Sequence, residues 1–153
     1  MAFVLQIKEV LQARLRRPWH FVVPGAPRND AAAIRAYLRT WYLVRRTGVL
    51  HAFRTDCEAT AKHLPKDNYD LSVAFAYGTA ATYSVLRSCV HLLHLVGACR
   101  QLHTDRLHIA IAGALLGREV LFYANNYYKN QAIYDFSIKS RFPHVQWMGS
   151  LTA

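Results

Sequence analysis

Two kinds of apolar spacing alternate along the chain and predict helices and strands in turn. Apolar residues three and four positions apart are typical of helices, whereas short apolar runs rich in β-branched and aromatic residues are typical of strands. The predicted helices cover residues 3–17, 31–46, 55–63, 82–95, 107–116 and 131–140. The predicted strands cover residues 19–23, 49–53, 101–104, 119–123 and 145–148, and residues 71–77 are expected to be extended.

This alternation of strands and helices predicts an α/β fold, a parallel sheet with helices on both faces. We divide the chain into a basic helical N-terminal segment, residues 1–47, and an α/β lobe, residues 48–153. In sheets of this kind ligands bind beyond the carboxyl ends of the strands, where the following helices begin. A candidate site is therefore expected at those strand ends.

Composition narrows the class of protein. The 153 residues are 53% hydrophobic and only 18% charged, which excludes an intrinsically disordered chain. No charge-free run is long and apolar enough for a spanning helix, and the first residues do not form a signal-peptide core. Three widely spaced cysteines, Cys57, Cys89 and Cys99, are expected to be reduced and buried. We therefore expect a cytoplasmic protein, with the inner face of the membrane as the alternative location.

The net charge of +10 is concentrated near the N-terminus, because residues 1–50 hold nine Lys and Arg against two acidic residues. A basic surface favours anionic partners such as nucleic acid, acidic lipid, phosphorylated metabolites or anionic sugars. No nucleic-acid-binding motif accompanies the arginines, so we expect no nucleic acid. The predicted helix over 3–17 carries Lys8 and several arginines, and any membrane contact is expected to be peripheral.

The segment 102–108 carries the most informative chemistry. It places Thr104, Asp105, Arg106 and His108 between a predicted strand and a wholly apolar helix. Unpaired backbone amides and the helix dipole favour an anion at such a helix start. Arg106 can bind a phosphate or carboxylate, and His108 can transfer a proton near neutral pH. The alternative is structural: Thr104 and Asp105 cap the helix, and Arg106 pairs with Asp105.

The sequence His103-Thr-Asp-Arg-Leu-His108, the apolar helix that ends at Gly117, and Asn125-Asn-Tyr-Tyr-Lys-Asn130 together resemble the polysaccharide pyruvyl transferase family. The stretch 53–58, with Arg54, Asp56 and Glu58, is similar to the family's Arg-x-Asp-x-Glu stretch, and Tyr69-Asp-Leu-Ser72 to the Asp-x-Ser that follows it. The resemblance implies a Rossmann-like parallel sheet with flanking helices, similar to the C-terminal half of a GT-B-type two-lobed enzyme.

The resemblance also implies an activity in exopolysaccharide or cell-surface polysaccharide biosynthesis. Such enzymes transfer the enolpyruvyl part of phosphoenolpyruvate to two hydroxyls of a saccharide acceptor, without a cofactor or a metal. By this resemblance Arg106 and His108 contact phosphoenolpyruvate, His108 is the catalytic acid/base, and Lys129 is a further substrate-binding residue. Thr104 and Asp105 cap the helix or orient Arg106.

The sequence departs from the family in two respects. Ala124 and Tyr128 stand where the family commonly has Asp and Gly, and the chain is about half the family's length, without the N-terminal lobe. We therefore expect a second lobe or a partner chain, and little transfer by this chain alone. The alternative function is a non-catalytic basic α/β module that docks on a partner or an acidic surface.

The histidines and cysteines between residues 89 and 103 suggest a second kind of site. Cys89, His91, His94, Cys99 and His103 could be zinc ligands. However, no Cys-x-x-Cys motif is present and the surroundings are apolar, which favours core residues instead. No metal is therefore expected.

Overall fold

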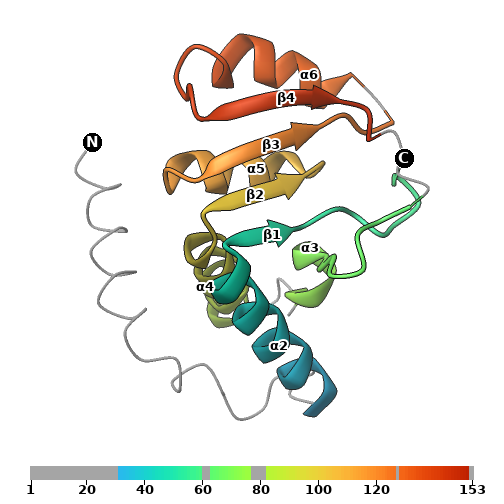
Figure 1. Ribbon diagram of the computed structural model, residues 1–153, viewed down its shortest axis with the longest axis vertical. Helices are drawn as coiled ribbons and strands as arrows, with labels where there is room; N and C mark the ends of the chain where they lie inside the picture. The colour runs from blue at the N-terminus through green and yellow to red at the C-terminus, as the bar shows by residue number, and fades with distance from the viewer. Residues whose placement is uncertain (1–30, 60–62, 77–81, 127, 152–153) are drawn as a thin grey trace.

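A computed structural model describes residues 31–59, 63–76, 82–126 and 128–151. Four parallel strands form one sheet in the order β1-β2-β3-β4 (Figure 1). They are β1 Val49–His51, β2 Gln101–Thr104, β3 Glu119–Tyr123 and β4 Val145–Gly149. The predicted α/β fold, a Rossmann-like parallel sheet with flanking helices, is confirmed. The predicted helix over 3–17 and the predicted strand over 19–23 lie outside the described residues.

Helices flank this sheet. In the order in which they occur along the chain, they are α2 Ala31–Thr47, α3 Leu71–Ala74, α4 Thr82–Ala98, α5 Leu107–Leu115 and α6 Lys129–Ile133, followed by the π-helical turn η2 Tyr134–Ile138. The helices predicted over 31–46, 82–95, 107–116 and 131–140 are confirmed, although the last one begins two residues earlier and ends in a π-helical turn.

Two local predictions between β1 and α4 are wrong. Residues 71–77 were expected to be extended, but they begin with α3, because the Asp70 carboxylate accepts hydrogen bonds from the Ser72 and Val73 amides and caps a helix. The predicted helix over 55–63 is not formed in its described part, residues 55–59 and 63. There the Asp56 carboxylate accepts from the Glu58 amide, which produces a turn instead.

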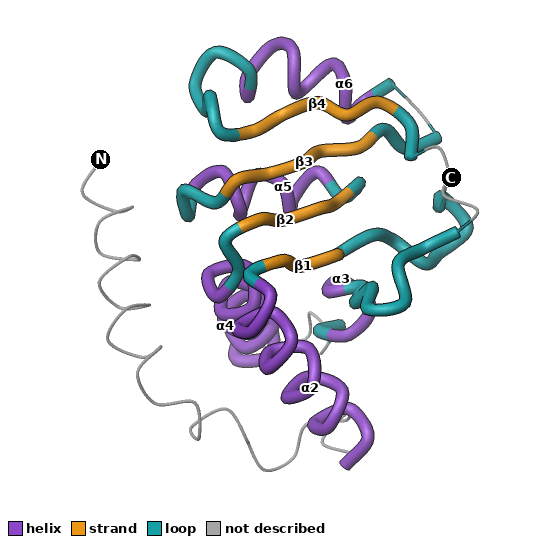
Figure 2. The backbone as a smooth tube through the Cα atoms, viewed as in Figure 1, coloured by secondary structure: helices purple, strands orange, loops and turns teal. Residues whose placement is uncertain are grey.

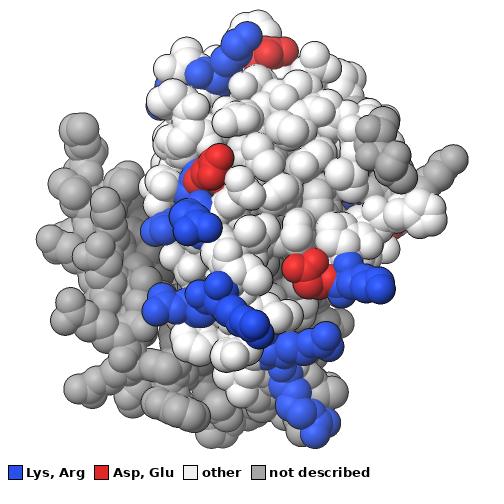
Figure 3. Space-filling view, in the orientation of Figure 1, with Lys and Arg blue, Asp and Glu red and all other residues white. Residues whose placement is uncertain are grey.

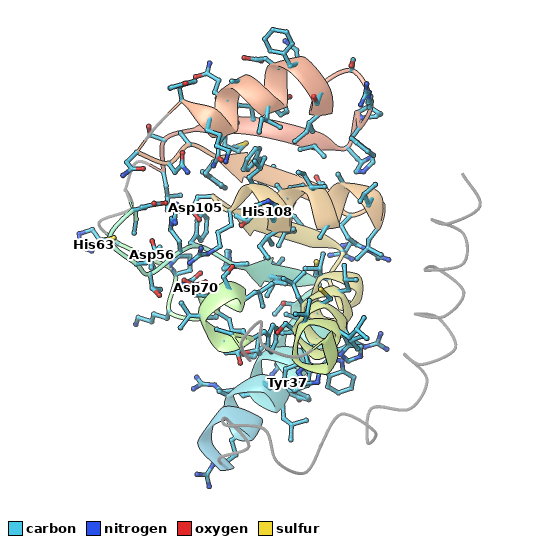
Figure 4. The ribbon with its side chains drawn as sticks, turned by 180° about the vertical axis from the view of Figure 1, so that it is seen from behind. Tyr37, Asp56, His63, Asp70, Asp105 and His108 are labelled. Carbon is cyan, nitrogen blue, oxygen red and sulfur yellow. The ribbon has the colours of Figure 1, made fainter. Side chains whose placement is uncertain are left out.

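The two faces of the sheet differ in burial. Leu50, Leu102, Val120 and Phe122 are buried, and they point toward the layer that contains α4 and α5. On the other face of β1 and β2, residues such as His51 and His103 are only partly buried. The prediction of helices on both faces is wrong for the described residues, because α4, α5 and α6 lie on one face (Figures 1 and 4). Right-handed crossovers between sequential neighbouring strands return the chain on the same face each time.

Close packing fixes the position of α5, which carries the predicted site. A Cβ atom at Gly113 would lie 2.7 Å from Leu102 Cδ2 and 2.8 Å from Val120 Cγ2, so only glycine lets α5 approach the sheet this closely. The helix α2 packs on the same core through Val44, with Tyr37 and Trp41 beside it. Thus α2 packs as part of the α/β unit.

The described cysteines have different surroundings. Cys99 is buried, as predicted, whereas Cys57 and Cys89 are exposed, so the prediction of three buried cysteines is wrong for those two. None of the three forms a disulfide. Burial raises the pKa of the Cys99 thiol to about 12. Within the described ranges, no helix combines the length and the apolar character needed to cross a membrane.

Candidate anion-binding site

A pocket of about 130 Å³ opens at the carboxyl end of the sheet. Its walls come from the loops that follow β1, β2 and β3 and from the first residues of α3, α5 and α6; the loops are teal in Figure 2. The lining residues are Arg54, Ser72, Asp105, Arg106, Leu107, His108, Ile109, Asn125, Lys129 and Asn130. The predicted position of the site, beyond the strand ends, is where this pocket lies.

Arg106, His108 and Lys129 all line this pocket, so the fold brings the three predicted substrate-binding residues together. Arg106 is the N-cap residue of α5, and His108 is exposed in the first turn of that helix. Lys129 is exposed at the start of α6. Figure 4 labels His108 beside Asp105, at the start of α5.

Thr104 and Asp105 were predicted either to cap α5 or to orient Arg106, and in the described part of the chain no side-chain cap hydrogen bond is formed at the start of α5. The Thr104 hydroxyl donates to the Ala52 carbonyl at 2.8 Å and accepts from the Arg106 amide at 3.1 Å, which ties the residue before the helix to β1. The Asp105 carboxylate accepts from the Arg54 amide at 2.9 Å instead. Within the described ranges, no side chain accepts from the first amides of α5, and Leu107, His108 and Ile109 line the pocket.

Arg106 forms ion pairs with Asp70 and Asp56, and not with Asp105. Its Nη2 atom lies 2.7 Å from Asp70 Oδ2 and 3.1 Å from Asp56 Oδ2. Its Nε atom is buried and has no hydrogen-bond partner in the described part of the chain. The guanidinium charge is thus balanced by two carboxylates, while one of its donors is unused.

The second arginine of the pocket is balanced in the same way. Arg54 Nε and Nη2 donate to the two oxygens of Asp56 at 2.8 and 3.1 Å, and Arg54 also pairs with Glu58. The hydrogen bond from Arg54 holds the pKa of Asp56 down, to about 2, so this carboxylate is ionised at neutral pH. Among the described residues, no ion pair involves Lys129, which makes it the uncompensated cation of the pocket.

Asp70 remains ionised despite its burial. Removal from water raises its pKa, but the hydrogen bonds from Arg106 and Thr55 outweigh that effect and keep the pKa below its ordinary value. Asp105 shows the opposite balance. Burial raises the pKa of Asp105 more than the Arg54 amide and the neighbouring arginine charges lower it. Two carboxylates with opposite pKa shifts therefore lie at the pocket. Asp70, beside the pocket, favours its charged form, whereas burial disfavours the charged form of Asp105, which lines the pocket.

No roles were predicted for the residues of the two stretches that resemble family motifs, Arg54, Asp56, Glu58, Asp70 and Ser72. The structure gathers the two stretches at the pocket, since Arg54 and Ser72 line it and Asp56 and Asp70 hold Arg106. Figure 4 labels Asp56 and Asp70 on neighbouring segments below the start of α5. The signal in the sequence that could have identified these residues as functional candidates was their spacing within the two stretches that resemble family motifs.

Two asparagines of the pocket were missed as functional candidates. Asn130 is 2% exposed and donates to the backbone carbonyls of Asp105 and Tyr123, which joins the start of α6 to the ends of β2 and β3. Asn125 Oδ1 is buried without a hydrogen-bond partner in the described ranges. The signal for both was their position in the polar stretch that follows β3.

The residues considered for zinc do not form a metal site. In the described ranges, no group of three or more His, Cys, Asp or Glu side chains is placed to hold a metal ion. His94 Nδ1 shares a hydrogen bond with the Tyr37 hydroxyl, and the Cys99 thiol donates to the Val96 carbonyl. His103 lies on the sheet, where it contacts Tyr123 and Gln101.

Comparison with known proteins adds one similarity. No protein-family model matches this chain, and no curated protein matches it. The crystal structure of a functionally uncharacterised protein from Klebsiella pneumoniae is similar, with 32% sequence identity and a TM-score of 0.56 over 69% of this chain. The match covers 36% of the Klebsiella protein, so this chain spans about a third of that protein's length.

Proposed function

We propose that this chain is the donor-binding lobe of a polysaccharide pyruvyl transferase, in which the pocket at the start of α5 holds phosphoenolpyruvate. The observation that carries the proposal is the uncapped start of α5, which opens into a pocket lined also by Arg106, His108 and Lys129. Backbone amides at a helix start and a nearby cation are the groups that bind phosphate and carboxylate.

The size of the pocket favours a small anion. A water molecule occupies about 30 Å³ in the liquid, so about 130 Å³ corresponds to a few water molecules. That space suits the phosphate and carboxylate of a three-carbon donor. Phosphoenolpyruvate carries both anionic groups. It is also the donor of the family that residues 103–130 resemble.

The proposed reaction assigns a role to His108. Formation of a cyclic ketal bonds two sugar hydroxyl oxygens to C2 of the donor and breaks its bond to the phosphate oxygen, which leaves as inorganic phosphate. Of the two hydroxyl protons removed, one is delivered to the methylene carbon of the donor and the other leaves with the phosphate. An arginine side chain can stabilise charge but is not an acid/base group near neutral pH. His108, exposed at the mouth of the pocket, is therefore the acid/base, and Lys129 binds the second anionic group of the donor.

The acceptor side of the site would come from a second lobe or a partner chain. The similar Klebsiella protein is longer than this chain, which is consistent with such a lobe. Tyr128, which is 84% exposed, lies between the pocket loops and α6, where a sugar could stack on it. The saccharide and a biosynthetic role in cell-surface or extracellular polysaccharide are part of the same proposal.

The test is calorimetric titration of the purified chain with phosphoenolpyruvate and with inorganic phosphate. Arg106→Ala should weaken binding by about 1.5–3 kcal/mol, the value of a hydrogen bond to a charged group. Arg141→Ala, at an exposed position in the turn after η2, is the matched control and should bind like wild type. Equal affinities of wild type and Arg106→Ala would contradict the proposal.

A second candidate function rests on α2. Arg35, Arg39, Arg45 and Arg46 are exposed on that helix, and Figure 3 shows blue side chains gathered over the lower part of the molecule, where α2 lies. This surface fits a non-catalytic module that docks on an acidic partner or an acidic lipid surface. Salt-sensitive binding to vesicles containing acidic lipid, together with no binding of phosphoenolpyruvate, would favour this candidate.

A further inference from the structure

Two carboxylates with different surroundings hold the same nitrogen of Arg106. Asp70 Oδ2 and Asp56 Oδ2 both accept from Arg106 Nη2, at 2.7 and 3.1 Å. The Asp70 side chain is 5% exposed, whereas that of Asp56 is 37% exposed. Equal contact with the guanidinium therefore does not imply an equal role for the two residues.

Asp70 is fixed in place by several donors. Its Oδ2 atom accepts from the Thr55 amide at 2.8 Å and from the Thr55 hydroxyl at 3.0 Å, in addition to Arg106. Its Oδ1 atom accepts from the Ser72 and Val73 amides at the start of α3. Asp70 cannot leave Arg106 without uncapping α3 and releasing the loop after β1, so its carboxylate is a rigid support.

Asp56 is held much less firmly. It lies in an exposed turn, and its carboxylate is bound on both oxygens by Arg54, so it keeps a partner if it releases Arg106. Water can replace its contact with Arg106 because the side chain is partly exposed. An anion entering the pocket would also meet the negative charge of Asp56 near the same guanidinium.

We propose that Asp70 is a positioning residue that fixes the Arg106 guanidinium for anion binding, and that Asp56 is a displaceable competitor for the same guanidinium. This inference rests on the proposed function, in which Arg106 binds an anionic donor. The two substitutions are then expected to act in opposite directions. A purely electrostatic account predicts the same direction for both, because each substitution removes one negative charge beside the pocket.

The test compares the affinities of four full-length variants for phosphoenolpyruvate and inorganic phosphate. Asp70→Asn should weaken binding about tenfold, because the guanidinium must then be ordered at binding. Asp70→Glu keeps the charge but displaces the carboxylate by one methylene, and it should weaken binding as well. Asp56→Asn should tighten binding about threefold, a modest gain typical of exposed charges. Asp67→Asn, an exposed acid that pairs with His51, is the control and should leave affinity unchanged.

A measurement made without ligand tests the positioning role of Asp70 independently of the proposed function. The buried Nε–H of Arg106 should give a slowly exchanging arginine signal by NMR in wild type, Asp56→Asn and Asp67→Asn. Asp70→Asn and Asp70→Glu should lose that signal while thermal unfolding still reports a cooperative fold. Retention of the signal in both Asp70 variants would overturn the positioning role, whatever the chain binds.

The binding outcomes are likewise distinct. If wild type and Asp56→Asn bind neither phosphoenolpyruvate nor phosphate, the proposed function and the competitor role of Asp56 both fail, and the NMR signal alone decides the role of Asp70. If wild type binds but Asp70→Asn and Asp56→Asn both bind more tightly, the electrostatic account replaces the proposal. If Asp70→Glu binds like wild type, the charge of residue 70, rather than its position, is what matters.

Discussion

The Asn130 amide lies 2.6 Å from the Asp105 carbonyl, and it thereby connects the start of α6 to the residue that precedes Arg106. The same amide group lies 3.4 Å from the Tyr123 carbonyl at the end of β3. One buried side chain thus satisfies backbone acceptors from the ends of two neighbouring strands. The geometry of the pocket depends on this connection, since both strand ends lead into its walls.

Replacement of Asn130 is expected to destabilise the fold. Asn130→Ala leaves the Asp105 and Tyr123 carbonyls buried without this donor, which should lower the free energy of unfolding by about 1–3 kcal/mol. Chemical denaturation of both proteins measures the difference. Asn126→Ala, at an exposed position in the same loop, is the control and should stay within about 0.5 kcal/mol of wild type. An unchanged midpoint for Asn130→Ala would show that solvent replaces the lost donor.

Lys129 is expected to contribute to anion affinity because no described carboxylate pairs with it. Lys129→Ala should weaken the binding of inorganic phosphate by about 1–3 kcal/mol, with little change in thermal stability. Lys139→Ala removes another exposed lysine, one that does not line the pocket, and should have no effect on binding. Titration calorimetry at low salt compares the three proteins. A similar loss in both variants would indicate a general charge effect instead of a specific contact.

The buried His94 is expected to make the fold sensitive to acid. Burial, together with the positive charge of Arg45, lowers the pKa of His94 from its ordinary value of 6.5. The unfolded chain therefore binds a proton at higher pH than the folded chain, and stability is lost as the pH falls below 6.5 toward the folded-state pKa.

The check is the free energy of unfolding measured across that range for wild type and His94→Gln. The variant should show a shallower decline than wild type. His103, whose pKa is also lowered by burial, supplies part of the remaining slope, and a double variant with His103→Gln should flatten it further. Parallel curves for wild type and His94→Gln would exclude the role of His94.

The contact of Gly113 with the sheet predicts a strong effect of added side-chain volume. Gly113→Val places a branched side chain against Leu102 and Val120 and should cost about 1–3 kcal/mol of stability through overpacking. Because α5 also begins the anion site, phosphate affinity should fall in the protein that remains folded. Gly97→Val, on α4, is a matched control because a Cβ atom there meets nothing within 4 Å. Similar losses in both variants would point to a cause other than contact with Leu102 and Val120, because valine has a higher helix propensity than glycine.

The thiols are expected to react in two classes. Cys57 and Cys89 are exposed, whereas Cys99 is buried and its pKa is raised to about 12, so it holds little thiolate at neutral pH. A disulfide reagent should modify Cys57 and Cys89 rapidly in the native protein, and Cys99 only after unfolding. Mass spectrometry of labelled peptides identifies the modified residues. Rapid native labelling of Cys99 would mean that the core around it opens readily.

The sequence by itself determined the succession of elements in the sheet. Strands over 101–104 and 119–123, and the helix between them, follow from local apolar patterns and from the glycine after the helix, so they could be predicted from residues close in the chain. The sequence also placed Arg106 and His108 after a strand, where ligands of parallel sheets bind, whereas Lys129 was predicted from the resemblance to the family.

Only the tertiary structure decided which groups Arg106 contacts and how the helices cover the sheet. Asp70, the carboxylate partner of Arg106, lies 36 residues away along the chain, whereas Asp105, next to Arg106, binds the Arg54 amide. A local pattern cannot distinguish a neighbouring acid from a distant one, because the choice depends on how the loop after β1 folds against the start of α5. The placement of α4, α5 and α6 on one face of the sheet has the same kind of origin, since strand order and crossover handedness are properties of the assembled chain.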